Sequence, residues 1–223
     1  MERWAVYYSP PKGSLLWEIG CRWIGRDAES GRKYEAPIGI DPTMWKTVTA
    51  IPAVYGLHAT LKPPMAITDG IDSEALLLAV KELAQATPQF STPPLALAWL
   101  DDFLILKPRC ECARLSMLAA SCVKELDRFR KPQTRQVPKT ATARQKILNR
   151  RWGYPFVLDE FRFHITLTSK LTAEQRSVVK YAANEFFKPV LTNKPLPVDN
   201  ICVFHQPEEG QDFYIKARFP LSY

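Results

Sequence analysis

A chain of 223 residues, with 46% hydrophobic and 24% charged residues, has the composition of an ordinary globular protein that buries a full core. No apolar run approaches the roughly 20 residues that cross a bilayer, which excludes a membrane-spanning protein and a membrane partner. The N-terminus enters a strand pattern at once and lacks the features of a signal peptide, so we expect a cytoplasmic protein.

The net charge of +7 is concentrated in one segment. Residues 124–151 hold ten Lys or Arg against two acids, so the remainder of the chain is close to neutral. Such a run is often only a solvated surface. It is equally consistent with a positive rim that draws a phosphate-bearing ligand, either a small molecule or RNA, into a site.

In chain order, the apolar spacing predicts a strand, then helices and hairpins around two similar strands. Helices are expected over about 15–25, 42–50, 72–87, 111–129, 140–151 and 172–187. Strands are expected over 3–9, 55–62, 95–100, 103–107, 161–168, 196–205 and 213–219. The prolines at 63 and 64 are expected to end the second strand.

The strands 55–62 and 161–168 carry the same four-residue unit. The first reads His-Ala-Thr-Leu from His58, and the second reads His-Ile-Thr-Leu from His164. In both, apolar and polar residues alternate, so one face packs on a core and the other presents a histidine and a threonine about 7 Å apart. Two of the three histidines of the chain therefore open the same motif, one in each half.

Motif strand, helix and hairpin occur in each half, which favours an α+β fold of two pseudo-symmetric lobes. Each lobe would be a small antiparallel sheet with helices on its outer face, and a central cleft would carry the two His-x-Thr motifs. We expect residues 1–223 to form a single bilobal domain, with the second half of an internal duplication starting near 110–140.

Paired imidazoles suit phosphodiester cleavage, because one can take a proton from water while the other gives a proton to the departing oxygen. The hydroxyls of Thr60 and Thr166 can bind the non-bridging phosphate oxygens as their charge grows. This chemistry needs no cofactor or metal. A metal site with His205 as third ligand is disfavoured, since no carboxylate or thiol stands at ligand spacing around the motifs.

These motifs, together with YGLHATLKPP (55–64) and the WGYP turn (152–155) before FRFH (161–164), resemble the two-histidine phosphoesterase superfamily. That superfamily includes LigT-like enzymes and cyclic nucleotide phosphodiesterases, and the bacterial branch that the chain resembles is encoded beside phosphonate-utilisation genes. The resemblance covers essentially the whole chain. It implies a bilobal fold, His58 and His164 as acid and base, and Thr60 and Thr166 as phosphate ligands.

The resemblance further implies metal-independent hydrolysis of a ribose or nucleoside cyclic phosphate, so the expected partner is a small phosphorylated ligand. Two alternatives remain: an RNA end-processing phosphodiesterase or ligase, and a non-catalytic nucleotide-binding or phosphate-binding protein. Lys62 and Arg162 share the faces of the motif histidines and are candidate substrate-binding cations. Of the two tyrosines in the first strand, we expect Tyr8 to line the cleft.

Overall fold

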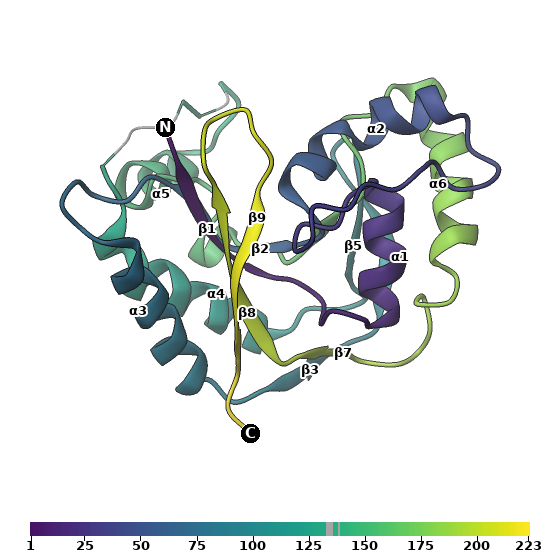
Figure 1. The fold of residues 1–223 in the computed structure, drawn as a ribbon. Helices are drawn as coiled ribbons and strands as arrows, with labels where there is room; N and C mark the ends of the chain where they lie inside the picture. The colour runs from purple at the N-terminus through teal and green to yellow at the C-terminus, as the bar shows by residue number, and fades with distance from the viewer. Residues whose placement is uncertain (133–135, 138) are drawn as a thin grey trace.

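The computed structural model describes residues 1–132, 136–137 and 139–223 (Figure 1). Its centre is a seven-stranded sheet with the order β4-β5-β6-β2-β1-β8-β9, in which every neighbouring pair is antiparallel. The strands of this sheet are β1 (Arg3–Tyr8), β2 (Ala59–Met65), β4 (Leu95–Leu100), β5 (Phe103–Pro108), β6 (Ile165–Thr166), β8 (Asn200–Gln206) and β9 (Tyr214–Pro220). A separate two-stranded ribbon pairs β3 (Phe90–Thr92) with β7 (Leu196–Val198).

Helices gather in two groups on either side of the central strands (Figure 1). One group is α1 (Leu15–Ile24), α2 (Pro42–Tyr55) and α6 (Ala173–Phe187). The other is α3 (Ser73–Gln85), α4 (Ala113–Leu126) and α5 (Ala143–Trp152), with the short 3-10 helices η1 (Asp127–Phe129) and η2 (Leu158–Glu160). The α+β class and the antiparallel strands are as the sequence predicts, and so are the positions of the six described α-helices, except for the end of α2. None of the described helices is long and apolar enough to cross a membrane.

The hairpins of the two halves are exchanged between the two ends of the sheet. The hairpin β4–β5 comes from the first half of the chain but pairs with β6, the second motif strand. The hairpin β8–β9 comes from the end of the chain but pairs with β1, which in turn pairs with the first motif strand, β2. The direct pairing of β2 with β6 joins both ends into one sheet.

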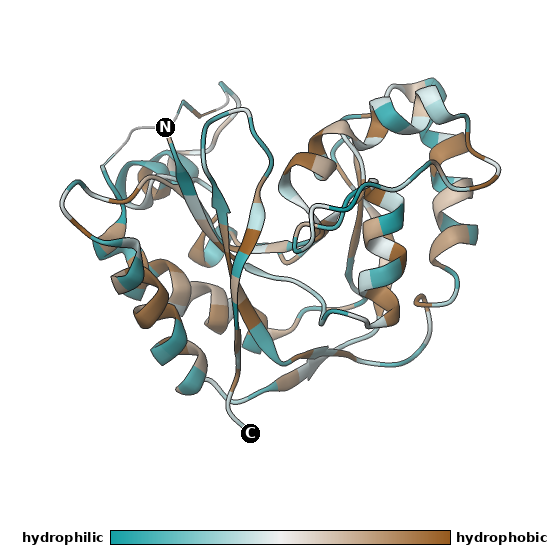
Figure 2. Cartoon of the chain, in the orientation of Figure 1, coloured by the Kyte–Doolittle hydropathy of each residue, from teal (hydrophilic) through white to brown (hydrophobic). Residues whose placement is uncertain are grey.

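Helix faces and caps follow from the sequence. The apolar side of α4 is buried through Leu115, Leu118, Cys122 and Leu126, and both α3 and α4 carry apolar and polar residues together in Figure 2. The hydroxyl of Thr172 caps α6 in a capping box with Gln175.

The helix α2 runs further than the predicted end near residue 50 and contains Pro52. The buried guanidinium of Arg26 accounts for the extra length, because it donates to the carbonyls of Ala53 and Val54 in the last turn.

Both motif strands differ from their predicted bounds. The first continues through Pro63 and Pro64, because β6 is too short to need hydrogen-bond donors from these two positions. The second shrinks from the predicted 161–168 to Ile165–Thr166, since η2 and an irregular segment precede it. The alternation of burial nevertheless holds: Phe163, Ile165 and Leu167 are buried, whereas His164 and Thr166 are partly exposed.

Candidate active site

The two motifs lie directly side by side in the sheet. Ala59 of β2 pairs with Ile165 of β6, and both side chains are buried in the core. In an antiparallel pair this register places His58 opposite Thr166 and Thr60 opposite His164. The four motif side chains therefore share one face of the sheet, the face turned away from the core.

Each histidine is held by the same short backbone contact. The Nδ1 of His58 lies 2.8 Å from the carbonyl oxygen of Gly56, and the Nδ1 of His164 lies 2.7 Å from that of Arg162. A carbonyl can only accept, so each Nδ1 carries its proton and donates. Each Nε2 is then the ring nitrogen left for chemistry, and in the neutral ring it is a proton acceptor.

Gly56 is required where it stands. Its φ of +77° belongs to the region that favours glycine, and a Cβ there would meet the Cβ of Ala28 at a separation that no side chain tolerates. The glycine thus allows the carbonyl that orients His58 to approach closely, and it connects α2 to the motif.

An aromatic cluster surrounds His58. The ring of Tyr7 stacks on the imidazole with centroids 3.9 Å apart and planes 24° apart, while Tyr55 and Phe204 lie at 5.9 and 6.1 Å. Phe213 stacks on Tyr55 at 5.1 Å and completes the cluster. Burial in this apolar setting disfavours the charged ring and lowers the pKa of His58 to about 4, and repulsion from His164 adds to the effect.

His164 has different surroundings. Within the described ranges no aromatic ring contacts it, and the Arg162 side chain beside it is exposed. Burial and the positive charge of Arg162 both lower the pKa of His164, although the hydrogen bond from Nδ1 to the Arg162 carbonyl partly opposes this change. The two histidines therefore lie in different surroundings, although the pKa of each is lowered.

The motif threonines are available to a ligand. Thr60 and Thr166 are partly exposed, and neither hydroxyl makes a hydrogen bond within the part of the chain that the structure describes. Thr168, the next residue on the predicted polar face, is instead fully buried, and its Oγ1 accepts the backbone N–H of Leu104. Thr168 is thus a structural residue.

The prediction that Lys62 shares the face of His58 and is a candidate substrate-binding cation is wrong. Tyr7 pairs with Thr60 but Val6 pairs with Lys62, so one extra residue of β2 bulges between them. A bulge turns the following side chains to the opposite face. The ammonium of Lys62 consequently lies under α4, 3.3 Å from Asp127, and only 2% of the side chain is exposed.

Tyr8 is also placed away from the motifs, which corrects the prediction that it lines the site. It pairs with Ala59, whose side chain faces the core, and its buried hydroxyl donates to the carbonyl of Pro197 at 3.0 Å. Its neighbour Tyr7 is the residue that reaches His58. Sequence alternation alone could not separate the two tyrosines, because it does not say which face of β1 meets the motif.

The two remaining candidates from the sequence are Arg162 and His205. Arg162 is exposed beside His164, and its substrate-binding role stays a prediction. His205 lies on the opposite face, stacked on Trp4 at 4.1 Å and bonded to the carboxylate of Glu2. No cluster of three potential metal ligands occurs among the residues that the structure describes.

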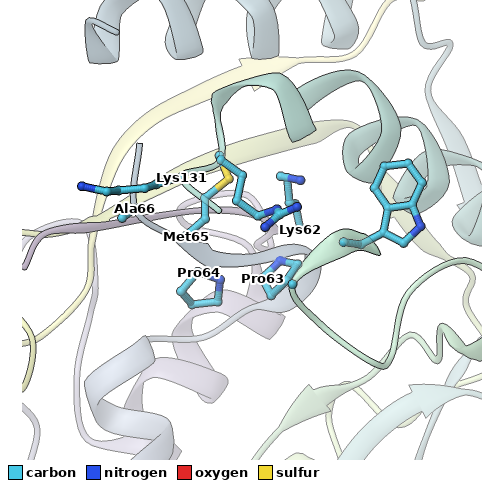
Figure 3. A pocket seen from close by; sticks show the side chains of 9 residues that line it. Lys62, Pro63, Pro64, Met65, Ala66 and Lys131 are labelled. Atoms are coloured by element: carbon cyan, nitrogen blue, oxygen red, sulfur yellow. The ribbon is translucent and has the colours of Figure 1, made fainter. Parts of the chain in front are cut away.

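The basic segment is partly neutralised inside the fold. Asp127 accepts from Lys62, from Arg130 at 2.7 Å and from Arg151 at 3.2 Å. A small cavity beside this cluster is lined by Lys62 to Ala66, Arg130, Lys131, Trp152 and Gly153 (Figure 3). It starts where β2 has already left the motif, so we assign it no part in the chemistry. Arg135 of the basic segment lies outside the described residues.

Comparisons with known proteins give two kinds of relative. The curated relatives include two proteins named ribose 1,5-bisphosphate phosphokinase PhnN. The protein from Laribacter hongkongensis (strain HLHK9) is 34% identical over 211 residues, which are 95% of this chain and 50% of that protein. The protein from Janthinobacterium sp. (strain Marseille) is 31% identical over 235 residues, covering 100% and 51%. The chain thus spans about half the length of these relatives.

Among solved structures, the Escherichia coli LigT complexed with 3'-AMP has a TM-score of 0.49 at 16% identity, covering 100% of this chain and 99% of that one. A crystal structure described as a phosphoesterase has the same TM-score and identity, with both chains fully covered. A family model described as protein of unknown function, DUF1045, matches residues 60–214, a span that includes the second motif and starts two residues after His58. The chain belongs to this DUF1045 family.

Proposed function

We propose that the chain is a phosphoesterase that opens a cyclic phosphodiester over the paired motifs without a metal. The observation that carries this proposal is the antiparallel register that sets His58 beside Thr166 and Thr60 beside His164 on one face. The site then offers a single ligand two imidazole Nε2 atoms and two hydroxyls that make no hydrogen bond among the described residues.

The paired imidazoles supply both proton transfers of hydrolysis. One imidazole Nε2 takes a proton from water as the water oxygen bonds to phosphorus. The other imidazole gives a proton to the ester oxygen of the cyclic phosphate as the bond from that oxygen to phosphorus breaks. The product is a phosphate monoester with a free hydroxyl. The hydroxyls of Thr60 and Thr166 donate to the non-bridging oxygens, whose negative charge grows in the transition state.

The relatives suggest a sugar substrate. They are about twice as long as this chain and carry the name of a kinase that acts on ribose 1,5-bisphosphate. Opening a cyclic phosphate of ribose yields a ribose phosphate monoester, which is the class of compound that such a kinase consumes. We therefore favour a ribose cyclic phosphate over a nucleoside cyclic phosphate, in a pathway of phosphonate utilisation.

The test is turnover in EDTA against a panel of ribose and nucleoside cyclic phosphates. We expect turnover that EDTA does not remove, with losses of about 100-fold or more in His58→Ala and in His164→Ala. His205→Ala is the matched control, because the third histidine lies on the other face of the sheet. Full activity in either motif variant would refute the proposal.

A further inference from the structure

The two motif histidines share a sequence context and a backbone contact but not an environment. Both donate Nδ1–H to the carbonyl two residues earlier. His58 alone is stacked on a ring, that of Tyr7, which is itself fully buried against Phe204 at 4.9 Å. The difference is confined to the His58 side of the site and is built by β1, α2 and β8.

We propose that Tyr7 is a positioning residue that commits His58 to the role of base and leaves His164 as the acid. This inference rests on the proposed function and adds a division of labour to it. Tyr7 is suited to the task because it pairs with Thr60 in the sheet, so β1 holds its ring on the same face as the motif. The backbone contact with Gly56 occupies Nδ1, so that Nε2 of the neutral ring is unprotonated and can accept a proton.

Acid–base catalysis by two imidazoles requires one proton shared between two rings. Mutual repulsion between His58 and His164 opposes a second proton. The single proton goes to the ring that is less costly to charge. That ring is His164, because the aromatic rings of Tyr7, Tyr55 and Phe204 enclose His58 and lower its pKa to about 4, whereas no described aromatic ring contacts His164.

The described groups that face His58 come from several elements of the fold. Tyr7 from β1 and Tyr55 from α2 lie against the ring, as does the apolar Phe204 of β8. The charge of His164, the residue just before β6, also acts on it. No carboxylate contributes to its pKa over the described ranges, so nothing offsets the loss of water. The face of Tyr7 attracts an imidazolium, but the low pKa means that exclusion of water outweighs this attraction.

The experiment is a titration of the imidazole nitrogens by NMR in the intact protein, without substrate. The chain has three histidines, and His205→Asn assigns the third. We expect His164 to take up its proton at a higher pH than His58, and His58 to keep the Nδ1–H tautomer at neutral pH. Tyr7→Leu and Tyr7→Met admit water and should raise the pKa of His58 by one unit or more, whereas Tyr7→Phe keeps the stack and should leave it in place.

Two results would overturn the inference: His58 binding a proton before His164, or a pKa of His58 that does not rise in Tyr7→Leu or Tyr7→Met. The wild-type titration decides the order of protonation even where a Tyr7 variant fails to fold. Since it needs no substrate, a protein that titrates as expected yet turns over no phosphodiester refutes the proposed function alone.

A leaving-group experiment separates the two roles in turnover. A p-nitrophenyl phosphodiester releases p-nitrophenolate, which departs without a proton. We expect His164→Ala to lose at least tenfold less activity on this ester than on the cyclic substrate, while His58→Ala loses as much on both. Rescue of His58→Ala instead would assign the roles in reverse and refute the inference.

Discussion

Replacing Asp127 by Asn should destabilise the protein more than the same exchange at an exposed carboxylate such as Asp159. In the part of the chain that the structure describes, Asp127 is the one carboxylate that pairs with Lys62, whose ammonium is buried 3.3 Å away beside the carbonyl of Val123. Removing one member of a buried ion pair leaves an uncompensated charge and costs about 3–5 kcal/mol. Arg130 and Arg151 lose less, because both also reach other acceptors or solvent.

The measurement is urea unfolding at pH 7, followed by fluorescence of the tryptophans. With a slope of about 2–3 kcal/mol per molar urea, a loss of about 3 kcal/mol lowers the midpoint by roughly 1 M. Asp159→Asn is the matched control, since its pair with Arg144 is exposed at 53% and 48% and should leave the midpoint nearly unchanged. A midpoint shift in Asp127→Asn no larger than in this control would refute the reasoning.

Two further results check that the buried charge is the cause. The double variant Lys62→Met with Asp127→Leu removes both charges, so it should recover most of the lost stability.

Burial would raise the pKa of Asp127, but the bonds from Arg130 and the charge of Lys62 outweigh it and lower that pKa. The carboxylate therefore stabilises the protein above its unfolded pKa and loses this effect as the pH falls, and Asp127→Asn should be less sensitive to acid than the wild type.

Thr60→Val and Thr166→Val should each lower kcat on the cyclic substrate about 100-fold. The melting temperature should not change, because neither hydroxyl makes a hydrogen bond to another described residue. A kcat within threefold of the wild type would contradict this. Gly20→Ala would drive a Cβ into the side chain of Leu57, next to the first motif. It should lower the free energy of unfolding by about 1–3 kcal/mol, even though alanine favours a helix more than glycine does. A gain in stability would argue against the packing described. The depressed pKa of His58 means that the unfolded chain binds its proton first, so stability falls from about pH 6.5 towards pH 4, and His58→Gln should flatten the urea midpoint in that window.

The sequence was sufficient where the side-chain period alone decides the outcome. Alternation of apolar and polar residues predicts that His58, Thr60, His164 and Thr166 turn away from the core, and it holds because Ala59 and both neighbouring leucines are buried. Apolar spacing likewise predicts α1, α3 and α4, since each of them buries an apolar face in the core.

Other features depend on pairing between distant strands, which no local pattern reports. The bulge that turns Lys62 under α4 arises where one residue step in β1, from Val6 to Tyr7, is paired with two residue steps in β2. The choice of Tyr7 over Tyr8 depends on which face of β1 meets the motif strand. The shortness of β6 depends on η2, which starts at Leu158, a residue with a φ of +55° that no apolar pattern predicts.

The exchange of hairpins governs how this protein folds. The strand pair β4–β5 waits for β6, which is synthesised about 60 residues later, and β1 waits for β8, nearly 200 residues later. Contacts between such distant segments close large loops before they gain stability, so folding should be slow and should be completed only after β8 has been synthesised. Neither half of the chain holds the strands that its own end of the sheet needs, and the two halves can therefore fold only together.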